Sequence, residues 1–321
     1  MKYQLAILCA GQGAQTVGMG RELAASFPGC RALFAKADEI LGYELQKIIF
    51  EGPENELVKS NHCQPAIFTV TIACFQALQF EISNLSFQAA AGLSLGEWSA
   101  LCLAGAISFE DGLRALEARG RYMQEACEEQ EGAMLSVIGL KHETLLKAAA
   151  DSGVEIANYN SSEQTVLSGR RPNIAEAEKM MGAAGARRVM LLNVAGAYHS
   201  SLMKSAAEKM RVFLEKVRIN PPKCTVMSNV SGRAHGSPEE IKRAMVAQII
   251  SPVKWIDCIR EMEKAGVNCY VECGPGRVLS GLVKRIQPPA RLGNVQDNRS
   301  LQAARELLGS NSGGDEISCK T

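Results

Sequence analysis

The sequence predicts an α/β protein in which a parallel sheet, covered by helices, is interrupted by a second and smaller unit. Short apolar strands alternate with helical stretches on both sides of residues 131–193, a pattern typical of a parallel sheet with helices on both faces. Within 131–193 the predicted order is β-α-β-β-α-β, that of a ferredoxin-like unit. The 321 residues suffice for one large domain with such an insertion.

The larger domain is predicted to comprise residues 1–130 and 194–300. Its strands are predicted at 4–9, 87–91, 225–228 and 270–273. Helical structure is predicted in several pieces over 17–60. Three further helices are predicted to begin at 65, at about 95 and at about 200. Others are predicted over 109–130, 237–250 and 252–265, and a last one is predicted to end at 286. Pro65 is taken as a first-turn residue, where proline is favoured. Ser108 and Asp111 form a capping pair for the helix that follows them.

The inserted unit is predicted at residues 131–193. Its strands are predicted at 133–139, 154–158, 165–168 and 187–192, and its helices at 142–151 and 173–185. The last residues, 310–321, are rich in Gly, Ser and Asp, and this composition predicts a disordered tail.

Composition excludes several classes of function. Lys plus Arg number 35 against 34 for Asp plus Glu, and aromatic residues are 5%, which argues against a nucleic-acid-binding protein. The most apolar window, 66–80, contains Thr and Gln and is predicted to be a core helix, not a membrane span. The N-terminal apolar run is too short for a signal peptide.

The eleven cysteines are scattered through apolar stretches, where reduced cysteine acts as a small hydrophobic residue. They form no CxxC pair, and only four histidines accompany them, so we expect no metal site. A reducing cytoplasm is the expected location. We also expect a monomer.

The strongest candidate for chemistry is Ser94. It lies in Gly92-Leu93-Ser94-Leu95-Gly96, between a predicted strand and a predicted helix, where Gly-x-Ser-x-Gly forms a nucleophile elbow. The glycines permit a tight turn, and the helix N-terminus would stabilise an oxyanion. The plainer alternative is a structural turn with a solvated serine.

A serine nucleophile requires a base, and His199 is the candidate. It follows the last strand of the insertion and precedes a helix, in the kind of loop where open α/β sheets place catalytic groups. Taken alone it could equally be a helix-capping histidine. The other histidines lie in a turn before a core helix, at a helix cap in the insertion and in a polar loop: His62, His142 and His235.

A hydrolase triad would place an acid between Ser94 and His199 in the chain, but the candidates are poor. Asp111 caps a helix, and the others fall in the insertion. This favours a Ser-His dyad whose imidazole is oriented by a neutral acceptor. Such a dyad suits the passage of an acyl group between thiols.

The chain resembles the malonyl-CoA:acyl carrier protein transacylase family of bacterial fatty acid synthesis. The resemblance extends over about residues 1–290 and is carried by Gly11-Gln12-Gly13-Ala14-Gln15, Gly92-Leu93-Ser94-Leu95-Gly96-Glu97, His199-Ser200-Ser201-Leu202-Met203 and Gly274-Pro275-Gly276. It implies a hydrolase-like α/β domain with a ferredoxin-like insertion. It also implies malonyl-CoA as substrate, acyl carrier protein as partner, and no metal or redox cofactor.

The resemblance assigns the site residues. Ser94 would be the acylated nucleophile and His199 its base. Gln12 and the backbone N–H of Leu95 would form the oxyanion hole. The backbone carbonyl of Gln248 would orient the histidine, and Arg119 would bind the malonyl carboxylate.

The sequence departs from the family's usual residues in three places. Leu93 stands where the elbow usually has His, and Ala10 replaces a common Pro. Ala197-Tyr198 replaces Pro-Phe or Pro-Ser before His199, in the segment that lines the acyl pocket of related acyltransferases. These changes leave open the choice between malonyl and methylmalonyl groups, and the pathway could be fatty acid or polyketide synthesis.

Arg119 also fits a ligand role on physical grounds. Gly120, which follows it, is unfavourable inside a helix by about 1 kcal/mol relative to Ala, so a close approach there is expected. An arginine fork matches a carboxylate through two hydrogen bonds, which lysine cannot do. A solvated helix arginine is the alternative, and we prefer that interpretation for Arg114 and Arg121.

Two other functions remain compatible with the sequence. One is a thioesterase or other hydrolase on the same dyad, and the other is a non-catalytic relative that binds the carrier protein. Acyl carrier proteins are usually acidic, so a basic docking rim is expected. Its candidates are Arg170-Arg171, Arg187-Arg188 and Lys284-Arg285, although scattered surface charge is an equally good interpretation.

Overall fold

The computed structural model describes residues 3–309 and contains two sheets. The predicted tail, 310–321, lies outside the described residues. The first sheet has the strand order β7-β2-β1-β8-β9, and each neighbouring pair is parallel. Its strands are β1 (Leu5–Cys9), β2 (Ala89–Gly92), β7 (Thr225–Val226), β8 (Cys269–Cys273) and β9 (Arg291–Val295).

Helices cover both faces of this sheet, as the sequence predicts. The side chains of β1 alternate between two hydrophobic clusters: Leu5, Ile7 and Cys9 belong to one, and Ala6 and Leu8 to the other. This alternation follows from the two-residue period of a strand. Near-continuous apolar strands are therefore needed, because each face of the sheet is buried.

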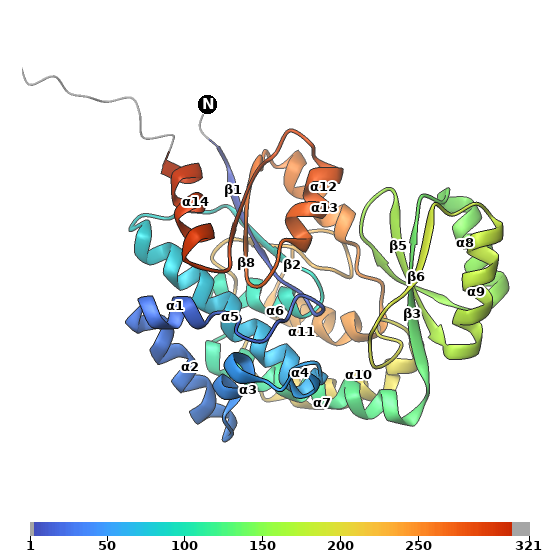
Figure 1. The fold of residues 1–321 in the computed structure, drawn as a ribbon, viewed down its shortest axis with the longest axis horizontal. Coiled ribbons are helices and arrows are strands. Elements are labelled where there is room, and N and C mark those ends of the chain that lie inside the picture. Colours follow the sequence, from blue (N-terminus) through green and yellow to red (C-terminus); the bar gives the residue numbers. More distant parts are fainter. Residues whose placement is uncertain (1–2, 310–321) are drawn as a thin grey trace, which may run out of the picture.

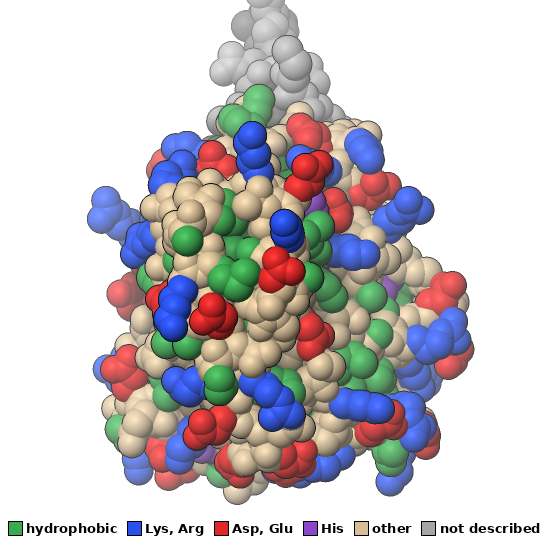
Figure 2. All heavy atoms as spheres, turned by 90° about the vertical axis from the view of Figure 1, so that its right-hand side faces the viewer, with side chains coloured by type: hydrophobic (Ala, Val, Ile, Leu, Met, Phe, Trp, Pro, Cys, Tyr) green, Lys and Arg blue, Asp and Glu red, His purple; other side chains and the backbone are tan. Residues whose placement is uncertain are grey.

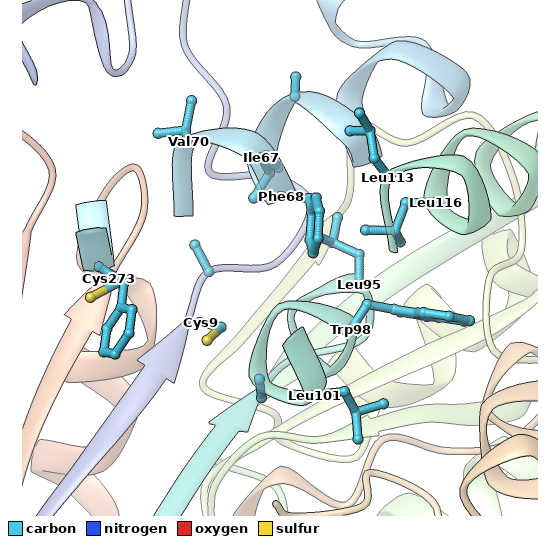
Figure 3. Packing of buried hydrophobic residues seen from close by; sticks show 14 of the residues in the cluster. Cys9, Ile67, Phe68, Val70, Leu95, Trp98, Leu101, Leu113, Leu116 and Cys273 are labelled. Carbon is cyan, nitrogen blue, oxygen red and sulfur yellow. The ribbon is translucent and has the colours of Figure 1, made fainter. Parts of the chain in front are cut away.

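The larger cluster lies under helices from the first half of the chain. These are α1 (Arg21–Ser26), α2 (Pro28–Leu41), α3 (Leu45–Glu51), α4 (Glu54–Leu57), α5 (Ser60–Glu81), α6 (Leu95–Leu103) and α7 (Phe109–Glu129). Figure 3 shows Phe68 of α5, Leu95 and Trp98 of α6, and Leu113 of α7 packed together above the strand ends. This packing fixes the start of α6, where the candidate nucleophile lies.

The remaining helices come after the second sheet. They are α10 (Lys204–Glu215), α11 (Pro238–Ala247), α12 (Trp255–Lys264), α13 (Val278–Ile286) and α14 (Asn298–Gly309), with 3-10 turns at Ser201–Met203 and Gln248–Ile250. The smaller cluster is formed mainly by α12 and α13, through residues such as Trp255 and Leu279.

Helix α5 begins at Ser60, five residues earlier than predicted, so Pro65 lies inside it. Its 22 residues are long and apolar enough to cross a membrane by length and composition, but 78% of its most apolar window is buried inside the protein. Such burial is what the core helix of a folded domain requires. The helix is therefore longer than the sequence suggested, and it serves as core.

Two elements were not predicted, namely β9 and α14. Strand β9 is the edge strand of the parallel sheet, and α14 packs on β9 and α5. Ordered helix packed against the first sheet therefore continues to Gly309, beyond residue 300. The strand β7 is shorter than predicted, because only Thr225 and Val226 pair with β2.

The second sheet is antiparallel, with the order β4-β5-β3-β6. Strands and helices follow one another here in the predicted order, β-α-β-β-α-β. They are β3 (Gly132–Ile138), α8 (His142–Ser152), β4 (Glu155–Tyr159), β5 (Gln164–Arg170), α9 (Arg171–Ala183) and β6 (Arg188–Leu191). It stands beside the larger sheet, with α8 and α9 on its outer side (Figure 1). Tyr159 N–H donates to the Val253 carbonyl at 2.9 Å, which joins β4 to the larger unit.

Candidate active site

Ser94 lies in a sharp turn between β2 and α6. Its φ is 55°, in the left-handed region that side chains other than glycine rarely adopt. The turn requires glycine on both sides: a Cβ at Gly92 would lie 2.0 Å from the Gly96 carbonyl carbon, and one at Gly96 would lie 2.3 Å from the Cys9 oxygen. The strand, turn and helix thus hold the Ser94 hydroxyl at the carboxyl edge of the parallel sheet.

His199 contacts Ser94 directly. Its Nε2 lies 2.8 Å from Ser94 Oγ, and its Nδ1 lies 2.8 Å from the backbone oxygen of Gln248. Because that carbonyl only accepts, Nδ1 carries the proton and Nε2 is free to accept one from the serine. His199 also has a positive φ, 59°. Its orientation is thus set by a neutral acceptor.

The environment of His199 keeps it uncharged. Burial, and to a smaller extent the positive charge of Arg119, lower its pKa to about 4, and the hydrogen bond to Gln248 opposes both effects. Burial disfavours the charged form because the interior solvates an imidazolium poorly. The imidazole is therefore in its basic form throughout the neutral range.

Arg119 is a buried cation at the same place, with 1% of its surface exposed. Its guanidinium donates to Gln64 Oε1 at 2.8 Å, to Ser94 Oγ at 3.0 Å and to Gln248 Oε1 at 3.0 Å. Across residues 3–309 no carboxylate pairs with it, and its Nε has no hydrogen-bond partner. Burial lowers its pKa to about 10, and the negative charge of Glu97 opposes that shift. A buried cation held only by neutral acceptors is suited to an anionic ligand.

The two segments that carry the predicted oxyanion donors, the loop after β1 and the start of α6, lie at the same edge of the parallel sheet. Gln12 lies three residues beyond β1, and β1 pairs with β2, which leads into Ser94 and Leu95. The Leu95 N–H opens α6, and within the described part of the chain neither it nor the Gln12 N–H donates to a protein acceptor. Two such backbone donors, close to a serine, can hold a developing negative charge.

Tyr198, one of the residues that departs from the family, is tied to the Gln12 loop. Its hydroxyl lies 2.8 Å from Ser60 Oγ. Gln12 Nε2 also donates to Ser60 Oγ, at 3.3 Å. Gln64 Nε2 in turn lies 3.5 Å from Gln12 Oε1. A chain of hydrogen bonds therefore runs from Tyr198 to Gln64, which is also a partner of Arg119.

The structure brings together Ser94, His199, Gln248 and Arg119 through direct contacts, with Leu95 and Gln12 beside them. Sequence reasoning missed Gln64, Glu97, Asn229 and the position of His235. His235 was expected in a polar loop, but its side chain is 2% exposed and contacts the carboxylate of Glu97. In residues 3–309 no group of three or more His, Cys, Asp or Glu side chains is placed to hold a metal ion.

A serine at a strand-to-helix elbow, with a buried neutral histidine as its partner, defines a class: serine-dependent α/β enzymes that handle acyl groups. Comparison with known proteins gives the family. The acyl transferase domain family matches residues 7–292, and the chain belongs to this family, within its group of malonyl CoA-acyl carrier protein transacylases. The resemblance drawn from the sequence is thereby confirmed.

Three relatives illustrate the match. The malonyl CoA-acyl carrier protein transacylase of Haemophilus influenzae is 38% identical over 309 residues, covering 95% of this chain and 99% of the relative. The crystal structure of the Clostridium perfringens transacylase has a TM-score of 0.91 at 38% identity and covers 96% of this chain and 98% of that one. PlMCAT, solved in complex with the type II polyketide acyl carrier protein AntF, also has a TM-score of 0.91 at 38% identity, with coverage of 96% and 100%.

Proposed function

We propose that this protein transfers a malonyl group from malonyl-CoA to the phosphopantetheine thiol of an acyl carrier protein. The observation that carries the proposal is the placement of Arg119. A fully buried guanidinium lies 3.0 Å from the candidate nucleophile and has only neutral partners. A malonyl group presents a thioester to Ser94 and a carboxylate to this cation.

The first half-reaction acylates the serine. His199 Nε2 takes the proton of Ser94, whose oxygen attacks the thioester carbonyl, and the N–H groups of Gln12 and Leu95 hold the oxyanion. The carbon–sulfur bond then breaks, and the imidazolium returns the proton to the departing CoA thiolate. Malonyl is left as an ester on Ser94.

The second half-reaction reverses these roles. The carrier thiol gives its proton to His199 and its sulfur attacks the ester. The carbon–oxygen bond breaks, and Ser94 regains the proton. No cofactor takes part, because every bond change in the transfer is balanced by the two thiols, the serine and the imidazole.

The neutral partner of His199 supports transfer over the hydrolase alternative. A thioesterase of the triad type would place a carboxylate on Nδ1, whereas Nδ1 here bonds the Gln248 carbonyl. We propose further that residues 131–193 form a ferredoxin-like subdomain inserted into the larger domain, and that the protein acts as a monomer in the cytoplasm. All ten cysteines within residues 3–309 are free thiols, consistent with a reducing compartment.

Intact mass after mixing with malonyl-CoA tests the proposal. We expect the mass of one malonyl group to be added to Ser94, to persist without carrier protein and to leave when the carrier bearing its phosphopantetheine arm is added. Rapid loss of the label to water would instead indicate a hydrolase. An unlabelled protein that still binds the carrier would indicate a non-catalytic relative.

A further inference from the structure

Glu97 is a buried carboxylate one helical turn after Ser94. None of its surface is exposed, and it accepts three hydrogen bonds from distant parts of the chain. Its Oε2 accepts from the Asn229 N–H at 3.0 Å and from Gln248 Nε2 at 2.6 Å, and its Oε1 lies 2.6 Å from His235 Nε2. A carboxylate is acceptor-only when ionised, so this arrangement fits an ionised Glu97 surrounded by donors.

The first of these partners braces the nucleophile turn. Asn229 Oδ1 accepts from the Ser94 N–H at 2.7 Å, and its Nδ2 donates to the Gly92 carbonyl at 2.9 Å. The turn between these two residues contains the positive φ of Ser94, a conformation that persists only when its surroundings hold it. Glu97, by fixing the Asn229 backbone, fixes this brace.

The second partner serves the base and the cation together. The Gln248 backbone oxygen orients His199, and its side-chain Oε1 accepts from Arg119. Its Nε2 donates both to Glu97 and to the Ser94 carbonyl, the latter at 3.0 Å. If Glu97 held Gln248 differently, the histidine and the arginine would both move.

We propose that Glu97, held from its other side by His235, is a positioning residue that sets Ser94, His199 and Arg119 relative to one another. The proposal rests on the proposed function, since it concerns the acylation of Ser94. The side-chain partners of Glu97 are Asn229, His235 and Gln248, and not Ser94 Oγ or the imidazole of His199. Glu97 acts through Asn229 and Gln248, and its negative charge offsets part of the unfavourable burial of Arg119.

His235 contacts Glu97 from a different segment, the loop between β7 and α11. Its side chain is 2% exposed, and it contacts Oε1, whereas Gln248 and Asn229 contact the other carboxylate oxygen, Oε2. His235 therefore keeps Glu97 from rotating away from these two partners.

The test compares Glu97→Gln with Glu272→Gln. Glutamine keeps the volume of Glu97 but turns an amide NH₂ toward donors. Glu272 is a matched control, because it is 1% exposed and accepts from the Leu279 and Ser280 N–H groups at the start of α13, outside the Glu97 network. We expect Glu97→Gln to slow single-turnover acylation at saturating malonyl-CoA by about 10²-fold, the scale of an ångström-level misplacement. Glu272→Gln should lower thermal stability while the folded protein keeps the wild-type acylation rate.

A coupling measurement separates positioning from general destabilisation. Because Glu97 acts partly through Gln248, Glu97→Gln should lower the rate less in a Gln248→Ala background than in the wild type. If the two losses multiply fully, Glu97 does not act through Gln248 and the proposal fails.

His235→Gln covers the case in which Glu97→Gln does not fold. It should slow acylation in the same direction by a smaller factor, and a wild-type rate in this folded variant would overturn the proposal. Failure of the wild-type protein to be labelled would overturn the proposed function. A labelled wild type with an equally fast Glu97→Gln variant would overturn only the positioning role.

Discussion

Arg119 Nη2 donates a hydrogen bond to Ser94 Oγ at 3.0 Å, so the buried cation and the candidate nucleophile are direct partners. The same oxygen lies 2.8 Å from His199 Nε2. A guanidinium can only donate, which leaves the serine proton for the histidine. The arginine thus selects the hydroxyl orientation in which the proton points to the base.

Arg119→Ala should change which acyl group is accepted. The malonyl carboxylate loses several kcal/mol of solvation when buried unless it is paired, and acetyl-CoA leaves the arginine without an anion. The ratio of kcat/KM for malonyl-CoA to that for acetyl-CoA should fall by roughly 10²-fold or more, since about 1.36 kcal/mol corresponds to tenfold.

The control for this prediction is Arg114→Ala on the same helix. Arg114 is half exposed and pairs with Glu110, so its removal should leave the ratio unchanged. If Arg119→Ala lowers both substrates by the same factor, Arg119 is a structural residue.

Ser94→Ala should abolish covalent labelling by malonyl-CoA and leave the protein folded. The hydroxyl contacts His199 and Arg119 but contributes no apolar packing. Intact mass gives the labelling, and circular dichroism gives the fold. Labelling that persists at another residue would refute the assignment.

His199→Ala should slow acylation by several orders of magnitude, because no other described group is placed to take the serine proton. In the wild type, the rate should stay level from pH 8 to about 5 and fall as pH approaches 4, the pKa to which burial and Arg119 lower this histidine. Arg119→Ala removes the second cause and should move that fall to higher pH. A wild-type midpoint near the ordinary histidine value would contradict the burial of His199.

The lowered pKa of His199 also makes the free energy of unfolding decrease at acidic pH. The folded pKa lies below the ordinary value of 6.5, so the unfolded chain binds the proton first as pH falls. His199 should therefore reduce the free energy of unfolding between pH 6.5 and 4, by on the order of 3 kcal/mol at the lower end. Urea unfolding at several pH values should show a smaller loss in His199→Ala than in the wild type.

Replacing Arg187 and Arg188 by Ala should weaken use of the carrier protein, and less so at high salt. The face over the second sheet carries Lys and Arg interspersed with Asp and Glu (Figure 2), so docking would depend on particular residues. Arg187 is exposed and pairs with Glu163.

The informative comparison for this pair is with a small pantetheine thiol as acceptor. The Arg187 and Arg188 replacements should leave the use of this small acceptor unchanged. Arg211→Ala should leave the use of the carrier unchanged, because Arg211 is an exposed arginine of α10, outside the second sheet. Equal losses with both acceptors would show that the pair does not dock the carrier.

Gly120→Ala should destabilise the protein by about 1–3 kcal/mol, the usual range for overpacking. A Cβ at Gly120 would lie 2.2 Å from the Ser60 carbonyl oxygen, so α7 would have to move from α5 and take Arg119 with it. Gly182→Ala is the matched control: it lies in α9 with nothing within 4 Å, and should stabilise by up to about 1 kcal/mol. Thermal unfolding of both variants decides the comparison.

Local sequence signals were enough to predict the elbow and most of the strand and helix order. Ser94 is flanked by glycines within five residues, and Ser108 with Asp111 caps α7 as expected. The missed strand β9 has no comparable signal, since four of its five residues are only partly buried. An edge strand needs no continuous apolar run, so its sequence resembles a loop.

The network around Glu97 could not be found in this way. Glu97 meets Asn229, His235 and Gln248 across 132, 138 and 151 residues of sequence. Each of these side chains, read locally, is an ordinary polar residue in a helix or loop. Only the tertiary fold shows that all are buried around one carboxylate.

Ser94 and His199 are the only non-glycine residues with positive φ in the described chain, 3–309. Each such conformation costs of order 1–3 kcal/mol, which a glycine at either position would relieve. A selection for heat resistance alone would therefore favour the two substitutions that we expect to abolish the proposed reaction. At these positions the demands of durability and of turnover are opposed, and the sequence has kept the residues that serve turnover.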